Sequence, residues 1–411
     1  MKSTKVTLLV GAVVTFIVWV LAVSGWLPHA PADPDTTSLS FLPQIAIFAT
    51  CAFLFAWTTL DTTQMVQKIF IALAGVALMF TCAWIVSLFG GYFAPFPPAT
   101  AIAFSLVAGI LYGYTEQGSR KRRLEALFGR RISSKDFARL VDDDAVPDFS
   151  GTRVEASVLV CEVQNQRELL GLMSPEDHTA MTNFYLQSAS EYLVGVGGYL
   201  DECTGSSLRV VFGAPVGVLD HATRACRAAV ELLKRLDDLN RECDARWQQR
   251  FDFRMGINSG ELLAAAYGGK RLANFSVTGP ATEFARRLCT ACGTYGARIL
   301  AGPDTVAQTG EAFEVRPVEV LVAETGKNRR VEIYEVLAPK GGLSEERERS
   351  RDHFWRGVLF YREGSFQKAF DEFQRARITG LPDPVIEFYI RRVDKAMQNN
   401  KIENPLNPAE A

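Results

Sequence analysis

The chain has 411 residues, of which 48% are hydrophobic and 22% are charged, and its formal net charge at pH 7 is -2. This length exceeds one typical domain, so two or three structural units are expected, and the near-neutral charge gives no support to nucleic acid as a partner. The scattered cysteines fit a reduced cytosolic compartment. Their best-spaced pair, Cys289 and Cys292, has no second pair with which to bind zinc and is interpreted as two helix residues.

Four apolar stretches predict an all-α, four-helix transmembrane region over residues 1–115. They cover about residues 6–27, 41–60, 69–93 and 99–114. A membrane-spanning helix needs about 20 mainly apolar residues, and the first three stretches meet this length. The fourth is shorter but uncharged and rich in Gly and Ala, which favours close helix packing in lipid. The first stretch is too long and too poorly ended for a cleaved signal peptide.

Basic residues flank these stretches unevenly. Lys2 and Lys5 precede the first stretch, and the run Arg120-Lys121-Arg122-Arg123 follows the fourth, whereas loops 28–40 and 92–100 contain no Lys or Arg. The positive-inside rule therefore predicts a multi-pass protein of the inner or plasma membrane with both termini in the cytoplasm. The two outer loops are too short to form an extracellular sensor domain.

Residues 116–150 predict a basic helical linker that resembles a signal transducer. Apolar residues recur on one helical face from Leu124 to Val141, and Asp142-Asp143-Asp144 with Pro147 ends the pattern. Two compatible roles are open: the basic run contacts anionic membrane lipid, or the helix dimerises and transmits membrane motion to the next domain.

Residues 151–340 predict an α+β domain of ferredoxin-like pattern. Residues 154–163 alternate as a strand, and Thr204-Gly205-Ser206-Ser207 forms a small-residue turn between two apolar runs. Helical segments lie between and after these runs. The order strand, helix, hairpin, helix, strand is typical of that pattern.

A helical tail is expected over residues 345–398. A charged, helix-prone segment comes first, followed by apolar residues at the spacing of a tetratricopeptide-like helix pair and by a third helix from Pro384 to Gln398. One repeat cannot bury its apolar face alone, so the tail is expected to pack on the preceding domain. Residues 399–411 are expected to be disordered.

Several motifs occur in a fixed order between residues 154 and 338. They are Val158-Leu159-Val160-Cys161-Glu162-Val163, the hairpin 197–215, Met255-Gly256-Ile257-Asn258-Ser259-Gly260, and the segment 275–288 with Gly279 and Arg287-Leu288. Together they resemble the catalytic domain of the class III nucleotidyl cyclases, the adenylate and guanylate cyclases. The resemblance implies a ferredoxin-like class III cyclase domain, here preceded by the four-helix transmembrane region and followed by the helical tail.

The resemblance also implies a reaction and its metal ions. Such enzymes convert a nucleoside triphosphate to a 3′,5′-cyclic monophosphate and pyrophosphate, with Mg or Mn ions held by two carboxylates. Those positions correspond here to Glu162 and Ser206. Glutamate can bind magnesium, but a neutral hydroxyl cannot replace a bridging carboxylate. Asp201 could reach the site only if the hairpin were remodelled.

The nucleotide-binding positions of the family correspond to Glu202 and Ser276 for the base and to Lys327 for the phosphates. Glu202 could accept hydrogen bonds from guanine, so GTP is favoured over ATP. The catalytic, transition-state positions correspond to Glu283 and Arg287, and a carboxylate at Glu283 repels the charge that develops. For Glu202, Arg287 and Lys327 the alternative of solvated surface residues stays open.

Three hypotheses follow for the function. The substitutions favour a membrane-anchored pseudo-cyclase in cyclic-nucleotide signalling, which regulates or scaffolds as a homodimer or heterodimer through its cyclase domain. Mg or Mn is expected as cofactor if the chain is active, with no cofactor as the alternative. The first alternative is an active cyclase, a phosphorus–oxygen lyase. The second is a membrane scaffold that binds partners through its helical tail.

Overall fold

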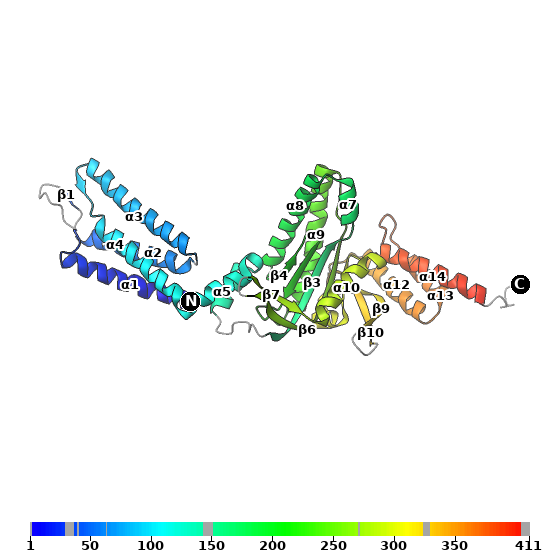
Figure 1. Cartoon of the computed structure of the whole chain (residues 1–411). Coiled ribbons are helices and arrows are strands. Elements are labelled where there is room, and N and C mark those ends of the chain that lie inside the picture. The colour runs from blue at the N-terminus through cyan, green and yellow to red at the C-terminus, as the bar shows by residue number, and fades with distance from the viewer. Residues whose placement is uncertain are drawn as a thin grey trace. The chain divides into compact units, whose positions relative to one another are not determined.

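The structure is a computed structural model that describes residues 2–28, 37–38, 41–62, 64–142, 151–269, 272–323 and 329–403. It divides into two compact units, each drawn in Figure 1. The first, here the apolar helical unit, comprises Met1–Leu127 with Leu140–Asp144. The second, here the sheet unit, comprises Phe128–Arg139 with Ala145–Ala411.

Four helices of the first unit's described residues are long and apolar enough to cross a membrane, in agreement with the predicted stretches. The elements are α1 (Lys2–Val23), α2 (Phe41–Asp61), α3 (Met65–Leu88) and α4 (Phe96–Tyr114), with a parallel pair of two-residue strands, β1 (Thr37–Ser38) and β2 (Gly91–Tyr92). Helix α1 ends before residue 27. Helix α3 begins before residue 69, so Lys68 lies inside a helix rather than in the loop expected from the sequence.

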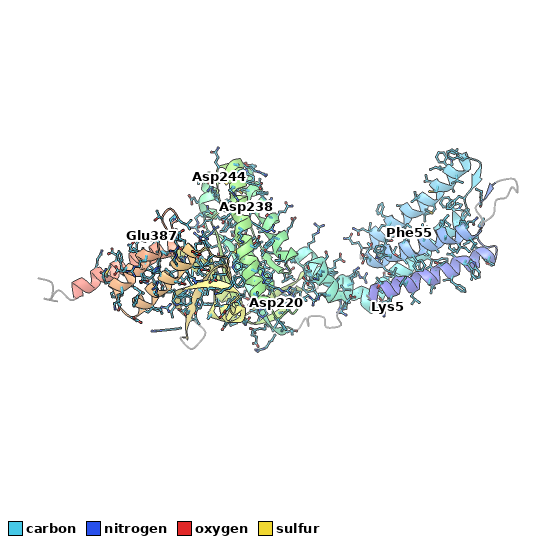
Figure 2. All side chains as sticks on the ribbon, turned by 180° about the vertical axis from the view of Figure 1, so that it is seen from behind. Lys5, Phe55, Asp220, Asp238, Asp244 and Glu387 are labelled. Atoms are coloured by element: carbon cyan, nitrogen blue, oxygen red, sulfur yellow. The ribbon has the colours of Figure 1, made fainter. Side chains whose placement is uncertain are left out.

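Close contacts between small and large residues hold α2, α3 and α4 together. A Cβ on Gly75 of α3 would lie 2.1 Å from the ring of Phe55 of α2, which Figure 2 labels. A Cβ on Gly109 of α4 would lie 2.7 Å from Thr59 of α2. The Thr59 hydroxyl also donates to the Ser105 carbonyl at 3.1 Å. Close approach of helices at small residues and hydrogen bonds between helices are the interactions that stabilise helix packing in lipid.

The predicted linker helix is interrupted, which the apolar spacing did not foresee. It consists of α5 (Glu116–Phe128), a 3-10 turn η1 (Gly129–Arg131) and α6 (Ser134–Asp142). Gly129 has a φ of +46°, a left-handed conformation that ends a helix and favours glycine. The break coincides with the boundary between the two units. Residues 143–150, the end of the predicted linker, lie outside the described residues.

The described strands of the second unit form one eight-stranded sheet of order β4-β5-β3-β6-β8-β10-β9, with β7 paired to β6. The strands are β3 (Thr152–Val163), β4 (Tyr199–Cys203), β5 (Ser207–Phe212), β6 (Phe253–Gly269), β7 (Leu272–Thr278), β8 (Ile299–Ala301), β9 (Phe313–Ala323) and β10 (Arg329–Pro339). The helices among them are α7 (Gln166–Leu172), α8 (Pro175–Gly195), α9 (His221–Trp247), α10 (Pro280–Tyr295) and α11 (Pro303–Thr309). The predicted order of strand, helix, hairpin, helix and strand is confirmed, and Cys289 and Cys292 are indeed helix residues.

The two faces of β3 pack against different helices. Alternate residues such as Leu159 and Cys161 enter the core that α8 and α9 form on one face. The intervening residues, Glu162 among them, point to the other face, where α10 packs. Figure 2 labels Asp220 and Asp244 near the two ends of α9. A Cβ on Gly256 of β6 would lie 2.1 Å from the Ala285 carbonyl oxygen, so glycine is what lets α10 approach the sheet.

The C-terminal helices pack on the β8, β10 and β9 end of the sheet, as predicted. They are α12 (Glu345–Arg362), α13 (Phe366–Ala376) and α14 (Pro384–Glu403). Phe354, Phe373 and Tyr389 from these helices share one core with Val318 of β9 and Ile333 of β10. Helix α14 continues to Glu403, so residues 399–403, which were expected to be disordered, are helical. Residues 404–411 lie outside the described residues.

A buried charge cluster joins this tail to the sheet. Arg316 of β9, only 4% exposed, binds Glu335 of β10 at 2.6 Å and Asp383, just before α14, at 2.7 Å. Burial acts to raise the pKa of Asp383, but the Arg316 guanidinium overcomes this effect and holds that pKa below its ordinary value. The tail is therefore a structural part of the sheet unit.

Replacing Arg316 by methionine should leave Glu335 and Asp383 buried without their partner and reduce the free energy of unfolding by about 3–5 kcal/mol. Urea unfolding of the full-length chain, followed by pulse proteolysis of the sheet unit, measures this loss. The exposed Arg330→Met on β10 is the control, with an expected change below about 0.5 kcal/mol.

The same charge cluster predicts a pH dependence. Because the folded-state pKa of Asp383 is depressed below 3.8, its contribution to stability is present above that pH and is lost as pH falls through the lowered value. The difference between wild type and Arg316→Met should therefore shrink in strong acid. Equal unfolding midpoints of wild type and Arg316→Met at neutral pH would contradict the role assigned to the cluster.

Candidate functional site

The structure brings the two predicted metal positions together. Glu162, near the end of β3, is in register with Ser207 of β5, and the backbone N–H of Val163 donates to the Ser206 carbonyl at 2.8 Å. Ser206 occupies the turn between β4 and β5. These neighbouring positions supply one carboxylate and one neutral hydroxyl.

Glu162 is half-buried beneath α10. Burial raises the pKa of Glu162 above its ordinary value, while the Arg286 guanidinium and a hydrogen bond with the Cys289 thiol act to lower it. The nearby Glu202 carboxylate adds to the rise. The environment of Glu162 therefore disfavours the ionised form of its side chain. Carboxylates with shifted pKa values are more frequent at functional sites than elsewhere.

Asp201 of β4 is the next acid on this side of the sheet, and an arginine already binds it. Arg209 of β5 contacts the fully buried Asp201 carboxylate at 2.6 Å and the Glu202 carboxylate at 3.0 Å. Burial raises the pKa of Asp201, and Arg209 and the Ser276 hydroxyl oppose that rise. Arg209 thus neutralises negative charge at both acids of β4.

Arg209 also shares a sheet face with Glu162. It lies opposite Val160 of β3, two residues from Glu162 on the same strand. Because side chains of paired residues point to the same face, Glu162 and Arg209 lie on the α10 side of β3 and β5. The Asp201 carboxylate of β4 joins them through its ion pair with Arg209. A positive side chain therefore stands on the strand between the two acids.

The two predicted base-contacting residues both lie near the Arg209–Asp201 pair. Glu202 follows Asp201 on β4, and the Ser276 hydroxyl of β7 lies close enough to Asp201 to affect its pKa. The Tyr199 hydroxyl donates to the Phe275 carbonyl and links the same two strands. Both polar groups are thus near the Arg209–Asp201 pair.

The predicted transition-state residues, Glu283 and Arg287, lie one helical turn apart on α10. Glu283 accepts two hydrogen bonds from Arg286, at 2.6 Å and 3.2 Å, and this pair is exposed. Arg287 lies with its guanidinium carbon 5.9 Å from the Phe284 ring centroid. Lys327, predicted to contact phosphate, lies outside the described residues.

The available donors do not fit a site for two divalent cations. Mg and Mn require several oxygen ligands and negative charge to offset their own. Glu162 is one such ligand, Ser206 is uncharged, and Asp201 is bound to Arg209. Among the described residues, no group of three or more His, Cys, Asp or Glu side chains is arranged to hold a metal ion.

Phe128 and Arg131, which flank the break in the predicted linker, contact the strands that carry Asp201 and Ser276. The ring of Phe128, almost fully buried, lies 5.8 Å from that of Tyr199 and 4.9 Å from that of Phe275. Arg131 donates to the Asp201 carbonyl at 3.3 Å. Residues on both sides of the Gly129 break therefore contact the strands of the candidate site.

The sequence reasoning missed Arg209, Arg286 and Phe128. A signal for Arg209 existed, because it interrupts the apolar residues of β5 and must face away from the core that Leu208 and Val210 enter. Arg286 stands three residues after Glu283, a spacing that brings helix side chains together. For Phe128 the apolar spacing indicated a buried face but not the strands that it contacts.

Comparisons with known proteins agree with this architecture. Adenylate cyclase 1 of Rhizobium meliloti (strain 1021) is 28% identical over 185 residues, which are 45% of this chain and 28% of that protein. An uncharacterized protein of Mycobacterium tuberculosis is 24% identical over 195 residues, which are 47% of this chain and 35% of that protein. The chain thus spans about a third of the length of the curated relatives that it matches. No family model matches it.

Two solved structures have similar folds. The guanylyl cyclase Cya2 is 23% identical with a TM-score of 0.42, and the similarity covers 47% of this chain and 97% of that one. The adenylyl cyclase CyaB from P. aeruginosa is 23% identical with a TM-score of 0.43, covering 47% and 99%. Over less than half of its length the chain is thus similar to a protein named as an adenylate cyclase, which is the resemblance that its motifs predicted.

Glu162→Gln should stabilise the chain at neutral pH in the absence of divalent cations, because it removes a carboxylate whose ionised form is disfavoured. The folded-state pKa of Glu162 is raised above 4.5, so the wild type loses stability as pH rises from 4.5 through the folded value. The gain of the variant should appear in that window and vanish below it.

Thermal unfolding of the full chain between acidic and neutral pH checks this expectation. Glu311→Gln, at an exposed carboxylate after α11, is the control and should leave the pH profile unchanged. A Glu162→Gln variant that is less stable than wild type at neutral pH would show that Glu162 makes a stabilising contact as a carboxylate.

Proposed function

We propose that the chain is a membrane-anchored, catalytically impaired cyclase-homology protein that regulates or scaffolds in cyclic-nucleotide signalling. In this proposal the four apolar helices cross the inner or plasma membrane and both termini lie in the cytoplasm. The sheet unit pairs with a second copy or with another cyclase domain. The observation that carries the proposal is the Arg209–Asp201 ion pair, next to a neutral Ser206 at the second metal position.

The electrostatics of the candidate site support impaired turnover. A nucleoside triphosphate with two divalent cations needs acidic ligands that are free to bind metal. At these positions Glu162 has one guanidinium nearby, and Asp201 and Glu202 share another. The chain's own arginines thus supply part of the positive charge that metal ions supply in a two-metal enzyme.

The substitution at Glu283 supports the same proposal. A transition state that gains negative charge requires donors such as an amide or a guanidinium. Glu283 presents a carboxylate instead and binds Arg286, which lies next to Arg287 on the helix. Losing one stabilising donor costs about 10²–10³ in rate, and the change at the metal position comes in addition.

The purified full-length chain in nanodiscs should form no cyclic nucleotide from ATP or GTP with Mn or Mg. Restoring the three positions in Glu162→Asp/Ser206→Asp/Glu283→Asn should produce measurable cyclic product, detected by mass spectrometry. Within this variant, reverting residue 283 to Glu should lower the rate about 10²-fold. Cyclic product from the wild-type chain would refute the impaired reading and support an active cyclase.

Arg330→Met, which is exposed on β10, serves as a control that leaves the candidate site intact. If the triple variant also forms no product while it still folds, the impairment does not lie at the assigned positions. Calorimetric titration of the wild-type chain with GTP and ATP then separates a nucleotide-binding regulator, for which Glu202 favours GTP, from an empty scaffold.

A further inference from the structure

Three basic side chains meet at one end of the apolar helical unit, where α2 ends, α3 begins and α4 ends. Lys68 of α3 donates to the Gly109 carbonyl of α4 at 2.7 Å. Arg122 of α5 donates to the Gly113 carbonyl of α4. Lys121 of α5 binds the Asp61 carboxylate at the end of α2 at 2.7 Å. We call Lys68, Lys121 and Arg122 the basic cluster.

Two charges of the basic cluster are near neighbours. Lys68 Nζ and Arg122 Nη1 each lie 3.9 Å from the position that a Cβ of residue 113 would occupy. Lys68 is only 5% exposed. The hydrogen bonds described for both cations go to main-chain carbonyls of the last turns of α4, which carry only partial negative charge.

The charges of the cluster are not balanced by these contacts. In the contacts described for these side chains, three cations meet one carboxylate, that of Asp61, which leaves a net charge of +2. A buried cation requires a full counter-charge nearby, and two adjacent cations repel each other. The arrangement therefore favours an anion beside Gly113.

The location of the basic cluster indicates which kind of anion it binds. If the four helices cross a membrane, their ends lie at the depth of the lipid phosphates. A guanidinium provides a planar fork for phosphate oxygens, and an ammonium provides a compact point charge beside it. A zwitterionic choline lipid would bring a cation to a site that already carries excess positive charge, whereas an anionic phospholipid would not.

We propose that the basic cluster binds the phosphate of an anionic phospholipid at the membrane face where α4 ends. The site rests on the proposal that α1 to α4 cross a membrane, and it is independent of whether the sheet unit turns over nucleotide. By holding α3, α4 and α5 around one headgroup, the lipid would fix the start of the linker that leads to the sheet unit.

Native mass spectrometry of the full-length chain, released from nanodiscs of phosphatidylcholine with a minority of phosphatidylglycerol, tests the site. The wild type should retain phosphatidylglycerol selectively. Arg122→Gln should weaken that retention about tenfold, the effect of losing one charge-assisted hydrogen bond. The matched control is Arg123→Gln, which removes the same charge from the neighbouring residue outside the basic cluster and should leave retention unchanged. Equal losses in both variants, or equal retention of phosphatidylcholine, would overturn the proposal.

A second pair of variants does not remove a basic residue. Gly113→Asp would add a carboxylate beside Lys68 and Arg122, whereas Gly113→Ala adds only a methyl group, for which the 3.9 Å clearances leave room. Gly113→Asp should raise the thermal unfolding temperature in pure phosphatidylcholine nanodiscs and abolish the further rise caused by phosphatidylglycerol.

Gly113→Ala should keep the rise caused by phosphatidylglycerol. If Gly113→Asp leaves that rise intact, the proposal is wrong. Inorganic phosphate added to phosphatidylcholine nanodiscs separates the two sources of the anion. A stabilisation equal to that of phosphatidylglycerol would assign the cluster to free phosphate and overturn the lipid site.

Discussion

The ion pair between Arg209 and Asp201 determines what the candidate site can do. It forms between adjacent strands at 2.6 Å, with the carboxylate fully buried, and the same guanidinium reaches Glu202. A buried carboxylate that has lost its water depends on such a partner for its charge. Glu162, on the same face of the sheet, has Arg286 nearby. Guanidinium groups thus lie beside both acids of the candidate site.

The same use of arginine occurs at the other end of the sheet. Arg316 joins β9, β10 and the start of α14 through Glu335 and Asp383, and the tail completes a core that the strands alone would leave exposed. The tail and the candidate site are therefore both stabilised by arginine–carboxylate ion pairs. Near the site, Phe128 anchors the linker on Tyr199 and Phe275.

Much of the fold could be predicted from the sequence because its signals are local. Apolar length indicated the four helices, period-two alternation indicated β3, and a small-residue turn between two apolar runs indicated the β4–β5 hairpin. The resemblance to the cyclases also predicted that Glu162 and Ser206 lie at one site. The sequence could not show that Arg209 binds Asp201, because that contact depends on strand register and on a bulge in β4 near residue 201. It also missed the break at Gly129 and the burial of Lys68, which depend on tertiary packing.

The most direct test of the central claim is manganese binding by the full-length chain, measured by electron paramagnetic resonance with a non-hydrolysable GTP analogue. If the arginines satisfy the acids of the site, the chain should bind no more Mn²⁺ than the nucleotide binds by itself, and Ser206→Asp should add binding. Two tightly bound Mn²⁺ ions per wild-type chain would contradict the account, because Glu162 and another acid would then be available to hold both.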